Sequence, residues 1–284
     1  MMRTPNAFAV AVRTPSGKLA LMKEGLEPCG WMRLTRWPVA RGFGVLVQAV
    51  GLGVRALNFS AVAALDPAVT VTETWQRRVG VGMSAAVAAG LSVGLFFFLP
   101  LYLTRLAASV LAPLGNWLLF NLADGAIRVA LFLAYLFGIS RMGDVRRLFQ
   151  YHGAEHKVVH NWEAGMELSV NNARRFSRLH PRCGTSFLMF VMLVSVALFS
   201  LFRFGSFAGL FLSRLALLPV VSGISYELIR LSARNSGNWL LRPLMKPGLW
   251  LQGITTREPS DDQLDVAICA LREALVIEEA RRAA

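Results

Sequence analysis

The chain has 284 residues, of which 55% are hydrophobic and 17% are charged, a balance that excludes an intrinsically disordered protein and fits a soluble domain poorly. Its 30 lysine and arginine residues outnumber its 17 acidic residues, so the net charge of +13 calls for an anionic partner, either nucleic acid or a phospholipid surface. Three scattered cysteines are too few for a disulfide framework. All four histidines lie within residues 152–180, which makes this segment the first candidate for a metal-binding or catalytic site.

The first 78 residues are expected to form a β-hairpin followed by an interfacial helix. Short apolar runs at residues 8–13 and 19–22 flank a Thr-Pro-Ser-Gly-Lys turn, which is the pattern of two antiparallel strands. Residues 42–65 are apolar apart from Arg55. They fit an interfacial helix, a re-entrant segment or a further span, and we expect the first. Residues 1–24 lack the apolar stretch of a cleavable signal peptide.

A mainly α-helical, polytopic membrane protein with about four transmembrane helices is predicted. A helix needs about 20 apolar residues to cross a bilayer. Four runs meet this length: residues 79–104, 114–140, 183–202 and 204–226. They form two pairs, within residues 79–140 and 184–226. Asp124 and Arg128 are four residues apart and can neutralise each other on one helix face, whereas Arg214 has no partner nearby in the sequence.

The distribution of basic residues predicts which segments face the cytoplasm. Ten precede the first span, eight lie between the second and third spans, and eight follow residue 226, whereas the other two connections carry one each. Because cytoplasmic loops are enriched in lysine and arginine, we expect both termini and residues 141–183 in the cytoplasm. The positive charge then reflects topology and contact with anionic headgroups of the lipid bilayer. Nucleic acid is disfavoured because no aromatic stacking platform alternates with the basic residues.

Small residues recur at four-residue spacing in the first and fourth spans: Ala86, Gly90, Gly94, Gly205 and Gly209. Such positions let helix backbones approach closely. They fit packing within one chain and contact between two copies in a homo-oligomer equally well.

Residues 227–284 are predicted to form a cytoplasmic loop and an amphipathic helix. Ser260, followed by two aspartates, resembles a helix start. Apolar residues follow at helical spacing: Leu264, Ile268, Leu271 and Leu275. This helix carries no evident chemistry.

The segment of residues 141–183 carries the candidate metal site. A helix that begins near Asp144 would place His152 and His156 on consecutive turns of one face, where both can bind one metal ion. Glu155 lies close to both and could act as a general base. The H-x-x-E-H spacing is that of inverted zinc peptidases. Two core histidines on an amphipathic helix are the simpler interpretation of the same pattern.

A further ligand is expected from the residues that follow. His180 and Cys183 are three residues apart, and imidazole with thiolate suits zinc. Glu227, at the end of the fourth predicted span, is a rival ligand. His160 continues the stripe, but we interpret it as a surface or core histidine.

Four arginines flank this segment: Arg174, Arg175, Arg178 and Arg182. They fit contact with anionic lipid headgroups. They also fit a phosphate-bearing substrate drawn to the metal.

Several motifs occur in an order that resembles the YqhQ-like family of bacterial membrane proteins. They are Met1-Met2-Arg3 with residues 9–13, residues 38–42, 151–157, 180–187, 225–227 and 247–259. The family is a domain of unknown function labelled as predicted metal-dependent enzymes. The resemblance implies an integral membrane protein with site residues His152, Glu155, His156, His180 and Cys183. The chain departs from the family pattern in lacking a Gly-rich segment before Met-Met-Arg and in carrying His160.

A polar loop bounded by Pro247 and Pro259 belongs to the last of these motifs. Its side chains are further site candidates: Gln252, Thr255, Thr256, Arg257 and Glu258. A rigid loop that caps the site and an ordinary structural loop explain it equally well.

The leading hypothesis is a zinc-dependent hydrolase in the bacterial inner membrane, with its site at the cytoplasmic face. His152 and His156 would bind zinc or another divalent metal with His180 or Cys183, and Glu155 would be the general base. The alternative is a non-catalytic scaffold or regulator with a structural metal. A transporter, which would depend on the charged residues within the spans, ranks third because no paired broken helices are evident.

Overall fold

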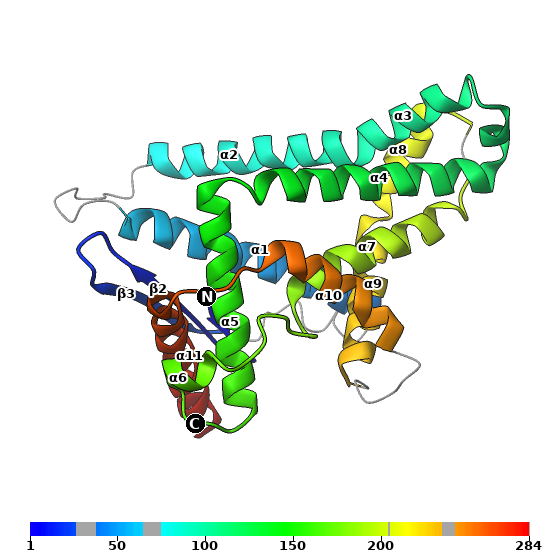
Figure 1. Ribbon diagram of the computed structural model, residues 1–284. Coiled ribbons are helices and arrows are strands. Elements are labelled where there is room, and N and C mark those ends of the chain that lie inside the picture. Colours follow the sequence, from blue (N-terminus) through cyan, green and yellow to red (C-terminus); the bar gives the residue numbers. More distant parts are fainter. Residues whose placement is uncertain (27–37, 65–74, 204, 235–241, 284) are drawn as a thin grey trace.

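The computed structural model describes residues 1–26, 38–64, 75–203, 205–234 and 242–283 (Figure 1). It confirms a mainly α-helical fold with a small N-terminal sheet. The helices are α1 (Pro38–Ala63), α2 (Trp75–Val93), the π-helical η2 (Gly94–Phe98), α3 (Leu99–Ala108), the 3-10 helix η3 (Ala112–Gly115), α4 (Trp117–Ile139), α5 (Gly143–Glu163), α6 (Val170–Ala173), α7 (Gly184–Phe199), α8 (Phe207–Ala216), α9 (Leu218–Arg234), α10 (Arg242–Thr255) and α11 (Asp261–Ala283).

The sheet consists of the antiparallel strands β1 (Met2–Arg3), β2 (Ala7–Arg13) and β3 (Leu19–Gly25). β2 and β3 are the predicted hairpin, and β1 adds a short third strand. Gly17 lies in the turn with φ of +81°, a conformation that glycine adopts without steric cost.

β2 is buried on both faces, because alternate side chains of a strand point in opposite directions. Ala9 and Ala11 belong to the core shared with α5 and α11. Phe8 and Val10 pack on the other side against Leu52 of α1. The strand therefore joins α1 to the α5–α11 pair, and Figure 1 shows these elements gathered around the sheet.

Among the described residues, three helices are long and apolar enough to cross a membrane: Val39–Ala63, Gly82–Ala108 and Trp117–Ile139. Phe207–Ala216 and Leu218–Ser232, bent by 45°, make a fourth if they form one span. In the structure, the predicted span of residues 183–202 is the 16-residue apolar helix α7, with Cys183 as its N-cap and Ser200 as its C-cap. Sixteen residues extend about 24 Å, less than the roughly 30 Å of a hydrocarbon core.

The contacts of the sheet fix the parity of the membrane crossings. β2, α5 and α11 share one core, so they lie on the same side of the membrane. The chain from β2 to α5 must therefore cross an even number of times, and so must the chain from α5 to α11. By this parity, α7 and the bent α8–α9 pair either both cross the membrane or both stay on one side. Among the described helices, the continuous helix α2–α3 and the helix α4 supply two crossings. If α1 also crossed, the total would be three, and α5 and the sheet would lie on opposite sides of the membrane. This parity supports the interfacial interpretation of residues 42–65, although α1 is long enough to span; Leu65 lies outside the described residues.

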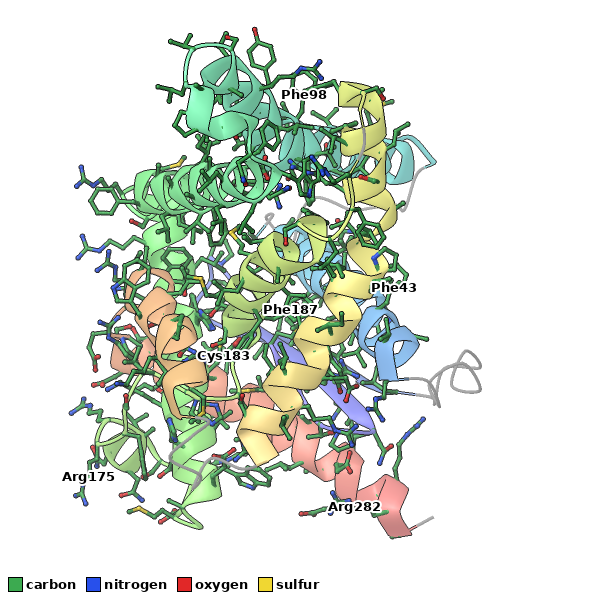
Figure 2. All side chains as sticks on the ribbon, turned by 90° about the vertical axis from the view of Figure 1, so that its right-hand side faces the viewer. Phe43, Phe98, Arg175, Cys183, Phe187 and Arg282 are labelled. Atoms are coloured by element: carbon green, nitrogen blue, oxygen red, sulfur yellow. The ribbon has the colours of Figure 1, made fainter. Side chains whose placement is uncertain are left out.

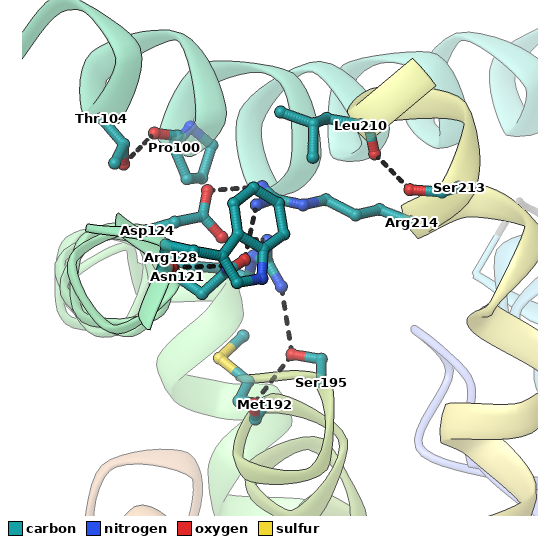
Figure 3. Close-up of polar contacts among 11 residues, drawn as sticks. Pro100, Thr104, Asn121, Asp124, Arg128, Met192, Ser195, Leu210, Ser213 and Arg214 are labelled. Carbon is teal, nitrogen blue, oxygen red and sulfur yellow. Dashed lines mark hydrogen bonds and ion pairs between the residues drawn. The ribbon is translucent and has the colours of Figure 1, made fainter. Parts of the chain in front are cut away.

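The charged residues of the predicted spans form one buried network (Figure 3). Asp124 accepts hydrogen bonds from Arg128 at 2.7 Å and from Arg214 at 2.6 Å. This confirms the predicted pairing of Asp124 with Arg128. It also supplies the partner that Arg214 lacks in the sequence, because α8 brings that residue to α4. Arg128 further donates to Ser195 of α7 at 3.0 Å, so the network ties three helices together.

Close packing uses glycines other than those predicted. A Cβ at Gly90, Gly94 or Gly205 would meet no atom of the described chain within 4 Å. A Cβ at Gly42 would instead lie 2.7 Å from Cα of Gly223, so these two glycines allow α1 to approach α9. Because Gly90, Gly94 and Gly205 have open space beside them, contact between two copies of the chain at these positions stays a prediction.

Candidate metal centre

The candidate site is built by three elements that are distant in sequence: the middle of α5, the turn before α7, and the end of α10. Asp144 lies in the first turn of α5, where its negative charge interacts favourably with the positive end of the helix dipole. The helix then presents His152 and His156 on consecutive turns. Figure 2 shows Cys183 at one end of α7. α5 and α7 therefore supply two imidazoles and one thiol to the same point.

The ligand atoms of His152, His156 and Cys183 all lie within 4.8 Å of one another. Nε2 of His152 is 3.1 Å from Sγ of Cys183. The two imidazole centroids are 4.4 Å apart. His156 and Cys183 are buried, each with 7% of its surface exposed. We call these three residues the His/His/Cys group.

Backbone carbonyls fix the tautomers of the two imidazoles. Nδ1 of His152 lies 2.9 Å from the carbonyl oxygen of Thr255, and Nδ1 of His156 lies 2.6 Å from that of Arg178. A carbonyl can only accept, so each Nδ1 donates and Nε2 is the nitrogen left for a proton or a metal ion. Metal-binding histidines are commonly held in this way.

The thiol of Cys183 is ionised readily in this setting. Burial would raise the pKa of Cys183, but hydrogen bonds and charge from His152 and His156 lower this pKa to about 5. Burial would lower the pKa of His152, but the contacts with Cys183, Thr255 and Glu155 raise this pKa to about 9. Thiolate is the form of cysteine that binds metals. A cation at this point would take the place of the shared proton.

His180 lies in a second group, together with His160 and Glu163, whose ligand atoms are also within 4.8 Å of one another. Nε2 of His180 is 3.3 Å from Oε2 of Glu163. Burial lowers the pKa of His180, and the neighbouring imidazoles of His160 and His156 lower it further. We call these three residues the His/Glu/His group.

Sequence reasoning named neither His160 nor Glu163 as a ligand. The available signal was a repeat of the H-x-x-E spacing, because Glu163 follows His160 as Glu155 follows His152.

Two predicted site carboxylates point elsewhere. Oε1 of Glu155 is 2.5 Å from the amino group of Met1, and the residue lines a cavity of about 550 Å³ between α1, β2 and α5. Glu227 on α9 pairs with Arg41 of α1 at 2.6 Å. Neither carboxylate joins the His/His/Cys group.

Residues 247–255 of the predicted polar loop are helical and belong to α10, so only residues 256–259 form a loop. Gln252, which lies on α10, fixes the turn that carries His180. Its Oε1 accepts from the backbone N–H of His180 at 2.8 Å, and its Nε2 donates to the carbonyl of His180 at 2.9 Å and to Ser186 at 3.0 Å. The side chain is fully buried. Gln252 therefore positions the His180–Cys183 turn and touches neither group of candidate ligands with its own polar atoms.

The remaining loop residues also act through the backbone or through ion pairs. Arg178 donates to the carbonyl oxygen of Thr256. The backbone N–H of Arg257 donates to the carbonyl of Phe149 at 2.8 Å. Glu258 pairs with Lys157 of α5. The loop is thus a support that holds α5 against α10.

The flanking arginines have partners within the chain. Arg182 pairs with Glu163 at 3.2 Å, and Arg174 pairs with Asp261 of α11. Together with the Arg178 contact, this engages three of the four flanking arginines in internal contacts. The geometry thereby favours a structural role for them over recognition of a phosphate.

Comparison with known proteins gives a family and a relative. The family model described as "Protein of unknown function (DUF1385)" matches residues 37–277. The uncharacterized protein YqhQ of Bacillus subtilis (strain 168) is 35% identical over 278 residues, which cover 95% of this chain and 87% of that protein. No solved structure matches the chain.

Proposed function

Because the chain belongs to the DUF1385 family, whose description assigns no activity, we propose a function from its site: a multi-pass membrane protein that binds zinc through His152, His156 and Cys183. The observation that carries the proposal is the convergence of these three ligand atoms within 4.8 Å, with each imidazole held by a backbone carbonyl. Two nitrogens and one thiolate form a borderline-soft donor set that suits zinc.

We further propose that the site is hydrolytic. Three protein ligands leave one position of a tetrahedral zinc site open, which is typical of catalytic zinc, and the chemistry that zinc supplies there is hydrolysis. A structural site would need a fourth protein ligand. Among the described residues, only these three belong to the group.

The distribution of basic residues supports a location of the site at the cytoplasmic face of the inner membrane. The sheet, α5 and α11 share one core, so the two ends of the described chain and the site lie on one side. Twenty-six of the 30 basic residues fall outside the four predicted spans and the two short connections between them.

Metal analysis of the detergent-purified protein tests the binding site. Cys183→Ser and the double variant His152→Ala, His156→Ala should each lose one zinc ion per chain relative to the parent. Cys269→Ser is the matched control, because Cys269 is a free cysteine on α11, and it should keep the metal. Equal zinc content in all four proteins would contradict the proposal.

Glu155→Gln tests the hydrolytic step. To act as general base, Glu155 would have to break its ion pair with the amino group of Met1 and accept a proton from the reacting water instead. The variant should then keep its zinc and its fold but lose the cellular function that a deletion of the protein removes. A silent variant would instead favour the scaffold with a structural metal.

The geometry also favours a second candidate, a cysteine nucleophile activated by histidine. Cys183 stands at the N-cap of α7 with His152 at 3.1 Å, an arrangement that activates thiolates. Alkylation by iodoacetamide separates the two candidates. Zinc should protect Cys183 if the thiolate is a ligand, whereas a nucleophile should react at the same rate with and without zinc.

A further inference from the structure

The last turn of α5 carries a second set of groups with ligand chemistry. His160 and Glu163 are three residues apart on this helix, and His180 reaches them from the turn before α7. The imidazole centroids of His160 and His180 are 4.5 Å apart. His180 is 5% exposed, whereas the Glu163 side chain is 26% exposed. The group is therefore closed on one side and accessible through its carboxylate.

Hydrogen bonds determine which ring nitrogen of each imidazole can reach a cation. Nε2 of His160 lies 2.9 Å from the carbonyl oxygen of Leu179 and so must donate, which leaves Nδ1 unprotonated in the neutral ring. Nδ1 of His180 accepts from the backbone N–H of Arg182 at 3.2 Å. In the neutral ring, Nε2 therefore carries the proton and donates it to Glu163 at 3.3 Å. To bind a cation through Nε2, His180 must move this proton to Nδ1 and give up the hydrogen bond from Arg182.

We propose that His160, Glu163 and His180 bind a second divalent cation. The set of two imidazoles and one carboxylate is harder than the His/His/Cys group and suits Fe(II), Mn(II), Co(II) or Zn(II). The two groups share no residue, so this site does not depend on the proposed zinc site. The His156 and His180 rings are 5.7 Å apart, which makes the two sites neighbours along one helix.

Charge also favours a cation in this position. Two imidazoles this close repel each other when both are protonated, and Glu163 can neutralise only one of them. Arg182 pairs with Glu163 at 3.2 Å, but 60% of its side chain is exposed, so it is held weakly and can be displaced. A divalent cation would satisfy both neutral imidazoles and the carboxylate at once.

Titration of the chelator-treated, detergent-purified protein with Co(II) tests the proposal, because cobalt reports on the two sites separately. A thiolate ligand gives a charge-transfer band in the near ultraviolet, so the band follows Cys183 alone. Equilibrium dialysis gives the total bound metal. The parent chain should bind two equivalents and show the band.

The variants should change the thiolate band and the amount of bound cobalt independently of each other. Glu163→Gln, and His160→Ala in a second protein, should each bind one equivalent and keep the thiolate band. Cys183→Ser should lose the band and keep one equivalent. Glu155→Gln is the matched control, since it also removes a carboxylate three residues after a histidine of α5, and it should bind two.

Two results would overturn the second site: a parent chain that binds one equivalent with the band, or Glu163→Gln and His160→Ala proteins that still bind two. Absence of the band with one equivalent bound would count against the zinc site and leave the second site standing. Circular dichroism of each variant checks that α5 remains folded.

Discussion

Nε2 of His152 lies 3.1 Å from Sγ of Cys183, although the two residues are 31 positions apart in the chain. The contact depends on the end of α10. The Thr255 carbonyl orients the imidazole, and Gln252 holds the turn that leads to Cys183. The candidate ligands are thus preorganised by α10, which supplies none of them.

Ionisation of Cys183 at low pH is the first prediction. In the metal-free protein, the thiolate absorbance should disappear with a midpoint near pH 5, because hydrogen bonds and charge from His152 and His156 lower the pKa of Cys183 from 9.0 to about 5. Ultraviolet titration, with Cys183→Ser as the baseline, measures it. A midpoint close to 9.0 would show that the thiol is not paired with the imidazoles.

The same pair predicts how stability depends on pH. The contribution from Cys183 is lost as pH falls from 9.0 to about 5, and the contribution from His152 is lost as pH rises from 6.5 to about 9. Between pH 6.5 and about 9, the Cys183–His152 pair holds one proton in the folded chain and one in the unfolded chain. The free energy of unfolding should therefore not change over this range. Below 6.5 the unfolded pair holds two protons and the folded pair one, so stability falls.

Thermal unfolding of the metal-free protein in detergent checks this profile. The unfolding midpoint should be flat from pH 6.5 to 9 and should drop toward pH 5 by more than it does in Cys183→Ser. A parent midpoint that rises steadily between pH 6.5 and 9 would mean that Cys183 titrates without His152.

Gly153 is the point where α5 meets the polar loop. A Cβ there would lie 2.1 Å from the carbonyl oxygen of Arg257, a backbone atom that cannot move alone. Gly153→Ala should therefore push the loop away from α5, cost about 1–3 kcal/mol of stability, and weaken zinc binding because the Thr255 carbonyl leaves His152.

Gly143→Ala at the start of α5 is the control, since a Cβ there meets no described atom within 4 Å. It should leave zinc affinity unchanged. Zinc affinity measured by competition with a chelator compares the two proteins. Equal affinities would show that the loop contact does not support the site.

The helical pattern predicted the pairing of His152 with His156, because both lie on one face of a single helix. It left His180 and Cys183 as equal alternatives, since the choice depends on the turn that Gln252 fixes from 72 residues away. The sequence also placed Glu155 near both imidazoles. The structure turns this carboxylate toward Met1, because its neighbours come from the N-terminal sheet.

The fold was predictable where one segment decides the outcome. The β-hairpin and the Asp124–Arg128 pair follow from local spacing alone. The partner of Arg214 depends on how α8 packs against α4, and the end of α7 depends on caps at Cys183 and Ser200. Composition could not separate an interfacial α1 from a spanning one, because an apolar helix of this length suits both.

Removal of Asp124 should be strongly destabilising. Asp124→Asn would leave Arg128 and Arg214 buried without a carboxylate, which costs about 3–5 kcal/mol when a buried ion pair is broken. Size-exclusion chromatography after heating measures the loss of folded protein.

The triple variant Asp124→Leu, Arg128→Met, Arg214→Met removes all three charges and should recover most of the stability. If cellular function returns with it, the network is structural. A stable but inactive triple variant would assign the network a function of its own.

The parity of the crossings predicts that both ends of α1 lie on the same side of the membrane. Cysteines introduced at Val39 and Ala61, both exposed near the two ends of α1, should then react with a membrane-impermeant maleimide from one side only, the side on which α5 lies. Val110, 82% exposed between α3 and α4, is the control for the opposite side. Labelling of the Val39 and Ala61 positions from opposite sides would make α1 a span. It would then place the sheet and α5 on different faces of the membrane, which their shared core forbids.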